Sequence, residues 1–245
     1  MHREIYNMRM RKKKHGAERL SSCAEYVYTH IGAPLSDPAG EVFNKSGAPV
    51  FLEIGAGKGG FAVGMIKKHP DCAYFALERV TDCVVLGAER AKSEVREGSL
   101  KFMIDSADNL TRVFGEGTVD RIFLNFSDPW SKKGYAKRRL THRRYLAVYM
   151  SLLKKGGKLR FKTDNVGLFD FTLEELEACG IPADIVTRDL HSSEWARDNV
   201  VTEYEASFTE LGMKINMLEI TRPDNVSLEI PPELRQERED YRSKN

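Results

Sequence analysis

Acidic residues recur at one kind of position in this sequence, at or shortly after the end of a short apolar run. The five that do so are Glu53, Glu78, Asp105, Asp128 and Asp164. If these runs are parallel strands, their carboxyl ends lie at one edge of a sheet, where such sheets bind ligands. Carboxylates accept hydrogen bonds and attract cations, and five at one edge exceed what packing needs. The sequence therefore predicts a ligand site with an acidic rim.

A glycine-rich loop follows the first acid. Gly55, Gly57 and Gly60 satisfy the pattern G-x-G-x-x-G, which gives a tight turn and close approach of the backbone to a ligand. Dinucleotide-binding folds and methyltransferases share this pattern. Glu53 would repel the anionic pyrophosphate of a dinucleotide, whereas S-adenosylmethionine has no phosphate and carries a sulfonium and an ammonium group. Charge therefore favours S-adenosylmethionine.

Two later acids fit the same ligand. Glu78 follows Gly55 by 23 residues, near the spacing at which an acid reaches ribose hydroxyls. Asp105 follows the third apolar run, where a carboxylate can accept a hydrogen bond from an adenine amino group. Each acid alone is also consistent with a surface residue at a strand end, but the set favours a ligand that contains a nucleoside.

The segment around Asp128 is the most specific in the chain. Residues 125–133 read Asn-Phe-Ser-Asp-Pro-Trp-Ser-Lys-Lys, so a rigid proline and a large flat tryptophan follow the acid. Residues 132–144 contain seven basic residues and no acid. Basic side chains interleaved with Trp130 and Tyr135 fit phosphate contact combined with base stacking.

Strands that alternate with helices must position these side chains. The predicted strands are residues 50–54, 73–77, 100–104, 121–126, 158–162 and 183–187. The predicted helices include residues 81–97, 141–153 and 166–179, with Thr81 and Thr141 as candidate N-caps. Residues 206–211 and 215–220, joined through Gly212, are expected to pair as a terminal hairpin. This order predicts an α/β fold with a doubly wound, mostly parallel sheet.

Length and composition fit one large domain. The chain has 245 residues, of which 41% are hydrophobic, enough to bury a sizeable core. We expect a basic arm and an irregular lead-in over residues 1–47, with a short helix near residues 22–28. The folded domain is expected over residues 48–222, and a tail over residues 223–245. The first 14 residues contain six basic residues and one acid.

Net charge and cysteine usage narrow the function classes. The net charge is only +2, so any surface for nucleic acid must come from local clusters of charge. The four cysteines form neither a C-x-x-C pair nor a zinc pattern, so we expect reduced thiols and no metal. We find no run apolar enough to span a membrane and no secretory signal, and we expect a cytoplasmic protein without a membrane partner.

With these motifs in place, the chain resembles the bacterial tRNA (guanine-N7-)-methyltransferase family over roughly residues 50–220. The likeness rests on blocks in the family's order, at residues 52–55 with the glycine loop, 125–133, 137–141, 162–165 and 202–205. It implies a class I methyltransferase fold, which is Rossmann-like, with a seven-stranded sheet whose C-terminal strand is antiparallel. It also implies S-adenosylmethionine as cofactor, no metal, tRNA as partner, and a monomer or homodimer. The implied product is 7-methylguanosine at guanine-46 of the tRNA variable loop.

The resemblance also implies roles for individual residues. Catalysis is implied at Asp128, and cofactor contacts at Glu53, Gly55, Gly57, Glu78, Asp105 and Asp128. Substrate contacts are implied at Lys132, Asp164, Thr202, Glu203, Tyr204 and Glu205, and RNA contacts at Gly134, Tyr135, Ala136, Lys137, Arg138 and Arg139. The chain departs from many relatives, which have Pro in place of Ser127 and Ser131 and an Arg-His pair in place of Gly134 and Tyr135.

The implied reaction needs no strong base. Guanine N7 already presents a lone pair, so the enzyme must align N7 with the methyl group and place negative charge near the purine. Asp128 is the candidate for that charge. Asp164 and Glu205 are candidates to accept hydrogen bonds from guanine N1 and N2, and so to exclude adenine.

Three alternatives remain open. A class I methyltransferase with a protein or a small molecule as substrate would keep the fold but leave the basic segment unexplained, and one with another RNA as substrate also stays open. A non-catalytic RNA-binding protein on the same scaffold would not need all five acids. A nicotinamide-dependent oxidoreductase is disfavoured by Glu53, and nothing in the sequence resembles a site for hydride transfer.

Overall fold

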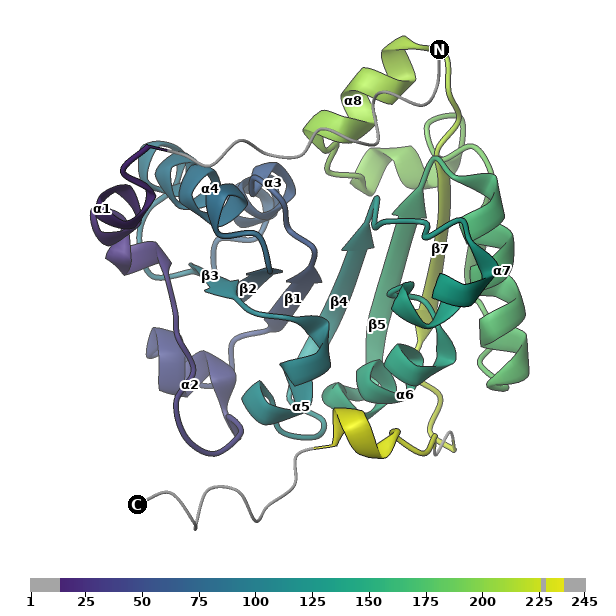
Figure 1. Cartoon of the computed structure of the whole chain (residues 1–245), viewed down its shortest axis with the longest axis horizontal. Coiled ribbons are helices and arrows are strands. Elements are labelled where there is room, and N and C mark those ends of the chain that lie inside the picture. Colours follow the sequence, from purple (N-terminus) through teal and green to yellow (C-terminus); the bar gives the residue numbers. More distant parts are fainter. Residues whose placement is uncertain (1–13, 226–227, 236–245) are drawn as a thin grey trace.

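One seven-stranded sheet organises the protein (Figure 1). The computed structural model describes residues 14–225 and 228–235. The strand order is β3-β2-β1-β4-β5-β7-β6, with bounds β1 Val50–Ile54, β2 Ala73–Glu78, β3 Leu100–Ile104, β4 Val119–Asn125, β5 Leu153–Thr163, β6 Ile185–Thr187 and β7 Asn216–Thr221. Strands β1 to β5 pair in parallel, while β7 runs antiparallel to both β5 and β6. The predicted α/β fold with a mostly parallel sheet is confirmed.

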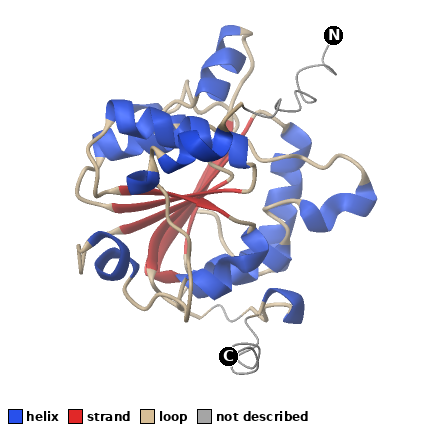
Figure 2. Ribbon diagram, turned by 60° about the vertical axis from the view of Figure 1, so that its left-hand side comes forward, coloured by secondary structure: helices blue, strands red, loops and turns tan. Residues whose placement is uncertain are grey.

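Helices cover both faces of this sheet (Figure 2). They are α1 Gly16–Ser21, α2 Pro38–Phe43, α3 Gly60–Lys68, α4 Thr81–Glu94, α5 Leu110–Val113, α6 Arg143–Leu152, α7 Val166–Ala178 and α8 Glu203–Glu210. Successive strand residues point to opposite faces, so β1 buries Phe51 beneath α3 and α4 and Leu52 beneath the layer that contains α2, α5, α6 and α7. Within the described ranges, no helix combines the length and apolar character needed to cross a membrane.

The segment before β1 is more regular than the sequence suggests. Helix α2 was not expected, and it forms because the Asp37 carboxylate accepts a hydrogen bond from Gly40 N at 3.0 Å. Pro38 is the first residue of the helix. A backbone N–H at this position has no acceptor within the helix, so a proline, which lacks the N–H, is tolerated there. Cys23 and Phe43 are buried in the two main core clusters, so this lead-in packs onto the sheet instead of forming a separate arm.

The short helix predicted near residues 22–28 is displaced. The α-helix ends earlier, as α1, and only a 3-10 turn, Ala24–Tyr26, follows it. Residues 1–13, which hold nearly all of the predicted basic arm, lie outside the described residues, as do residues 226–227 and 236–245 of the predicted tail.

The predicted terminal hairpin is wrong. Residues 206–211 lie in and just after α8, because Thr202 and Glu205 form a capping box in which each side chain bonds to the backbone of the other. Gly212, with a φ of 73°, then ends the helix in the left-handed conformation. Strand β7 consequently pairs with β5 and with the short β6, which begins two residues later than expected.

Both predicted N-caps are also wrong. Helix α4 begins at Thr81 itself, so that Val80 holds the capping position. Thr141 is fully buried, and its hydroxyl is hydrogen-bonded with the hydroxyl of Thr172 on α7 at 2.8 Å. His142 caps α6 in its place, by accepting a backbone hydrogen bond at 3.1 Å. A tertiary contact to α7, and not a local cap, therefore fixes the end of the basic segment.

Gly59 provides a test of how the glycine loop packs against α4. Its φ is 72°, and a Cβ added there would lie 2.5 Å from Cζ of Phe102 and 3.2 Å from Cα of Gly87. We expect Gly59→Ala to lower the free energy of unfolding by about 2–4 kcal/mol, through backbone strain and overpacking. Urea unfolding would measure this loss.

Gly98→Ala is the matched control. Gly98 has a φ of 98°, but no atom lies within 4 Å of an added Cβ, so only backbone strain applies and the loss should be about 1–2 kcal/mol. Equal losses in the two variants would show that packing against Phe102 contributes nothing.

Candidate functional site

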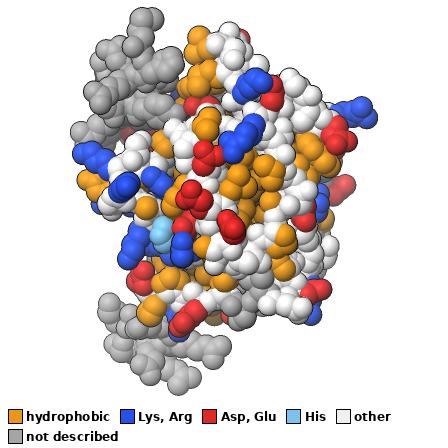
Figure 3. All heavy atoms as spheres, turned by 90° about the vertical axis from the view of Figure 1, so that its right-hand side faces the viewer, with side chains coloured by type: hydrophobic (Ala, Val, Ile, Leu, Met, Phe, Trp, Pro, Cys, Tyr) orange, Lys and Arg blue, Asp and Glu red, His pale blue; other side chains and the backbone are white. Residues whose placement is uncertain are grey.

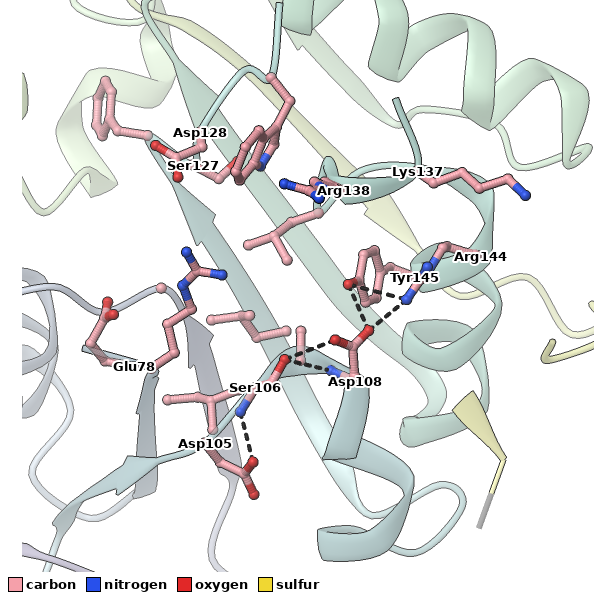
Figure 4. A pocket seen from close by; sticks show the side chains of 18 residues that line it. Glu78, Asp105, Ser106, Asp108, Ser127, Asp128, Lys137, Arg138, Arg144 and Tyr145 are labelled. Atoms are coloured by element: carbon pink, nitrogen blue, oxygen red, sulfur yellow. Dashed lines mark hydrogen bonds and ion pairs between the residues drawn. The ribbon is translucent and has the colours of Figure 1, made fainter. Parts of the chain in front are cut away.

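A cavity of about 460 Å³ opens at the carboxyl ends of β1 to β4. Its lining includes Gly55, Glu78, Asp105, Asp128, Lys137 and Arg138 from the predicted set, together with Ser106, Asp108, Phe126, Ser127, Trp130, Arg144 and Tyr145. Glu78 and Asp105 approach from one side, and Lys137 and Arg138 from the other (Figure 4). The cavity thus has an acidic wall that faces a basic one.

The glycine loop and Glu78 form one hydrogen-bonded unit. Gly55 and Gly57 have φ values of 81° and 54°, a conformation in which glycine avoids the steric cost of a Cβ. The Glu78 carboxylate accepts hydrogen bonds from Gly57 N at 3.0 Å and from Val80 N at 2.9 Å. The loop backbone therefore holds this acid in place beside the cavity.

Asp105 is anchored in a similar way. Its Oδ1 accepts hydrogen bonds from Ser106 N at 2.7 Å and from Asn109 Nδ2 at 2.6 Å. Since both bonds fall on the same oxygen, Oδ2 stays available to a ligand. Its contact with an adenine amino group stays a prediction.

Glu53 does not line the cavity but lies beneath it. Only 2% of its surface is exposed, and its carboxylate accepts hydrogen bonds from Asn125 Nδ2 at 3.0 Å and Tyr74 OH at 3.2 Å. Burial raises the pKa of Glu53 to about 7, against the opposing effect of these two hydrogen bonds. Near neutral pH this group is therefore only partly charged, which weakens the repulsion of a pyrophosphate that the sequence argument assumed. Its contact with a cofactor stays a prediction.

The loop that carries Asp128 is strained and firmly held. Phe126 and Trp130 bracket the acid with φ values of 52° and 42°, which non-glycine residues adopt only where surrounding structure imposes them. Arg139 supplies that restraint, because its guanidinium donates hydrogen bonds to Pro129 O at 2.9 Å and Trp130 O at 3.2 Å. Asp128 itself is exposed at the cavity.

Aromatic and basic side chains form the opposite wall. Arg138 lies 5.0 Å from the ring of Trp130 and 4.7 Å from that of Tyr135, and the two rings meet edge to face. Arg138 and Tyr135 belong to the 3-10 segment Lys133–Arg138, which includes the predicted RNA contacts Gly134 and Ala136. Lys132 precedes this segment and is exposed, outside the cavity lining.

Two buried polar atoms at the end of β4 are without a protein partner. Asn125 Oδ1 and Ser127 Oγ are inaccessible to solvent and make no hydrogen bond with the described residues. Buried polar atoms are rarely left unpaired, and Ser127 lines the cavity. Unsatisfied acceptors beside an acidic rim fit a cationic ligand that carries hydrogen-bond donors.

The sequence analysis missed one cluster in the cavity wall. The Asp108 carboxylate accepts hydrogen bonds from Arg144, from Tyr145 OH at 2.8 Å and from Ser106 Oγ at 3.0 Å. The basic run that contains Arg144 was noted, but its acidic partner lies 36 residues away, so no local pattern joins them.

The remaining predicted substrate residues lie beside the cavity, outside its lining. Asp164 follows β5 and is partly buried. Glu203 is ion-paired with Arg90, and the ring of Tyr204 lies 5.1 Å from that of Phe126. Glu205 is fully buried and hydrogen-bonded through both carboxylate oxygens. A direct contact between Glu205 and a substrate would require some of these bonds to break, so that role stays a prediction.

Comparison with known proteins identifies related chains. A family model described as "Putative methyltransferase" matches residues 47–218. Three bacterial proteins with the name tRNA (guanine-N(7)-)-methyltransferase are similar. The Macrococcus caseolyticus protein is 41% identical over 172 residues, 70% of this chain and 80% of that protein. The Halalkalibacterium halodurans protein is 43% identical over 168 residues, 69% and 76% of the two chains. The Exiguobacterium sp. protein is 37% identical over 219 residues, 89% and 100%.

Solved structures share the fold at low sequence identity. The 16S rRNA methyltransferase KamB superposes with a TM-score of 0.58 at 11% identity, covering 80% of this chain and 97% of that one. An antibiotic-related methyltransferase superposes with a TM-score of 0.55 at 16% identity, covering 78% and 96%. Both support the class I methyltransferase fold, and at these identities they support nothing further.

The buried Glu53 carboxyl gives a prediction for the pH dependence of stability. Its pKa is raised from 4.5 to about 7 on folding, so between those values the folded state keeps a proton that the unfolded chain releases. Stability therefore falls as pH rises through this window, by about 3 kcal/mol from this group. Glu53→Gln removes the effect, so it should unfold at a higher denaturant concentration than the wild type at pH 8, but not at pH 5.

The control is Glu97→Gln, which changes an exposed carboxyl. Its denaturation midpoint should equal that of the wild type at both pH 5 and pH 8. If the denaturation midpoints of Glu53→Gln and the wild type differ by the same amount at pH 5 and at pH 8, the buried carboxyl does not titrate in this window.

Proposed function

The chain belongs to the tRNA (guanine-N7-)-methyltransferase family, and from this premise we propose that it methylates N7 of guanine-46 in the variable loop of tRNA, with S-adenosylmethionine as the methyl donor. The observation that carries the proposal is one cavity whose lining combines the carboxylates of Glu78, Asp105 and Asp128 with basic and aromatic side chains. Glu78 and Asp105 form the acidic wall, and Asp128 lies nearer to Arg138 (Figure 4). The acidic wall suits a cationic nucleoside cofactor, and the basic wall suits RNA. We take residues 48–222 as the catalytic domain.

The cofactor side is built from the sheet. Gly55 and Gly57 give the loop its close approach, Glu78 is placed for the ribose hydroxyls, and Asp105 presents Oδ2 for the adenine amino group. Glu53 lies beneath the loop and contributes only a partial charge near neutral pH. S-adenosylmethionine, when bound, supplies an electrophilic methyl group at this site.

The protein's part in the chemistry is alignment and charge. Guanine N7 has a free lone pair, so no residue must remove a proton from it. Alignment of the purine by a rigid site is worth up to about 7–11 kcal/mol of the barrier. Asp128, exposed on a loop held by Arg139, places a carboxylate near the purine as it becomes cationic, and such preorganised charge adds about 3 kcal/mol.

The RNA side is built from the basic segment. Trp130 and Tyr135 offer faces for base stacking, and Arg138 is already stacked on both rings. Lys132 and Lys137 are exposed and can contact phosphates. On the face shown in Figure 3, basic side chains lie mainly at the margins and acidic and apolar ones nearer the middle. Charge is thus concentrated locally, although the net charge is only +2.

We also propose that the protein acts in the cytoplasm. The four cysteines are free thiols, which fits a reducing cytoplasm where tRNA is modified. The alternative is a methyltransferase that acts on a different RNA or on a protein. Identifying which molecule receives a labelled methyl group distinguishes this alternative from the proposed function.

Transfer of label tests the proposed activity. With labelled S-adenosylmethionine and unmodified tRNA, the wild type should place label in 7-methylguanosine. Asp128→Asn should lower kcat by about 10²–10³-fold, as for loss of one preorganised electrostatic group, while equilibrium dialysis shows that cofactor is still bound.

Asp170→Asn is the control, since Asp170 is an exposed carboxylate on α7 that pairs with Arg188. It should retain full activity. Label in another nucleoside or in protein would overturn the substrate assignment and keep the fold and cofactor.

Base selectivity tests Asp164. If its carboxylate accepts hydrogen bonds from guanine N1 and N2, a tRNA with inosine at the target, which lacks the 2-amino group, should be a poorer substrate by about 10–100-fold for the wild type. Asp164→Asn should reduce this ratio toward one. An Asp164→Asn enzyme with unchanged rate and unchanged selectivity would remove Asp164 from base recognition.

A further inference from the structure

Residues 198–205, which we call the strap, run from the 3-10 turn Glu194–Asp198 into α8 and lie against α3. Lys68 on α3 donates a hydrogen bond to Asp198 O at 3.0 Å. Further along, Glu203 is ion-paired with Arg90 on α4. Helix α8 continues the strap above the carboxyl ends of β4 and β5 (Figure 1). The strap therefore bridges the cofactor half and the substrate half of the sheet edge.

Lys162, at the end of β5, directs all of its hydrogen bonds to the strap. Its ammonium donates to Glu205 Oε2 at 2.6 Å, to Asn199 Oδ1 at 2.9 Å and to Val200 O at 3.0 Å. An ammonium has three donors, so none is left for a substrate. Its side chain is 1% exposed. Because all three acceptors of this buried ammonium lie on the strap, Lys162 holds β5 and the strap at a fixed distance from each other.

The strap is seated on α3 at a glycine. A Cβ added to Gly64 would lie 2.5 Å from Cγ1 of Val200. Glycine in the interior of a helix is less favourable than alanine, so the stability of α3 by itself does not account for Gly64. Close approach of the strap does account for it.

The seated strap borders the cavity. Tyr204 packs on Phe126 at 5.1 Å between ring centroids, and Phe126 lines the cavity two residues before Asp128. Lys162 also lies over the ring of Phe126, at 5.9 Å. A shift of the strap away from α3 would therefore move contacts on the loop that carries Asp128.

We propose that the strap is a positioning device for the RNA substrate, in which Lys162 is a positioning residue and the Gly64 seat sets how closely the strap approaches the cavity. The proposal rests on the proposed function, because the substrate whose position it sets is the target guanosine. It assigns Lys162, Gly64 and Val200 an effect on the target nucleotide, although none of them lines the cavity.

Paired substitutions at the seat test this proposal. Gly64→Ala favours the helix but overpacks against Val200, so the melting temperature should be equal to or below that of the wild type and the strap should be displaced. We expect KM for tRNA to rise about tenfold or more, with the cofactor dissociation constant within about twofold of the wild type. Val200→Ala removes Cγ1, and the Gly64→Ala/Val200→Ala double variant should recover KM to within about threefold of the wild type.

General damage to the fold would also weaken cofactor binding, whereas the proposal confines the effect to KM for tRNA. Recovery in the double variant would show that the contact between residues 64 and 200 causes the effect, because substitutions at residues in contact are coupled. The proposal is overturned if Gly64→Ala leaves KM for tRNA unchanged or if the double variant does not recover it. Asn199→Ala gives a second test, since it removes one of the three strap acceptors of Lys162 and leaves the buried ion pair with Glu205 in place. It should keep near-normal stability and still show a raised KM.

Hydrogen exchange separates failure of this proposal from failure of the proposed function. Backbone amides of residues 199–206 should exchange faster in Gly64→Ala than in the wild type and recover in the double variant, whatever reaction the enzyme catalyses. A wild type that labels no tRNA would refute the proposed function, and the exchange data would then still decide whether Gly64 seats the strap. Unchanged exchange in Gly64→Ala would refute the seat itself.

Discussion

Hydrogen bonding between neighbouring parallel strands is the constraint on which the rest of this structure depends. Because β1 to β5 run in one direction, their carboxyl ends must meet at one edge, and residues as far apart in the chain as Ile54 and Leu124 become neighbours there. Glu78, Asp105 and Asp128 share one cavity for this reason. Without the shared strand direction, each would be an isolated surface acid of no particular chemistry.

Beneath that edge, buried polar groups link loops that differ in function. The Glu53 carboxylate joins β1 to β4 through Asn125, and the Lys162 ammonium joins β5 to the strap through Glu205. Burial raises the pKa of Glu53 and lowers that of Lys162, because both charged forms lose hydration. Each is tolerated only with its hydrogen-bond partners in place, so these bonds fix the relative positions of the loops above them.

Opposite charge on two sides of the cavity fits the division between cofactor and RNA that we propose. The acidic wall comes from strand ends, whereas Lys137 and Arg138 come from a 3-10 segment that is joined to the Asp128 loop by Arg139. The loop strain at Phe126 and Trp130 is sustained by those contacts. A rigid scaffold thus supports the residues that we propose as contacts for cofactor and RNA.

The sequence by itself determined the strand-helix alternation, the acidic rim, the glycine loop and the basic segment, because these depend on hydrophobic period, turn chemistry and local composition. It failed in two ways. It overlooked a local signal, the capping box that makes residues 206–210 helical, and it could not foresee a distant contact, the hydrogen bond between Thr141 and Thr172. Only the tertiary structure decided that Glu53 lies buried beneath the cavity, that Asp108 pairs with Arg144 and that Glu205 is held by Lys162. These outcomes depend on which side chains the fold brings together, and sequence spacing carries no information about pairs that meet across the sheet.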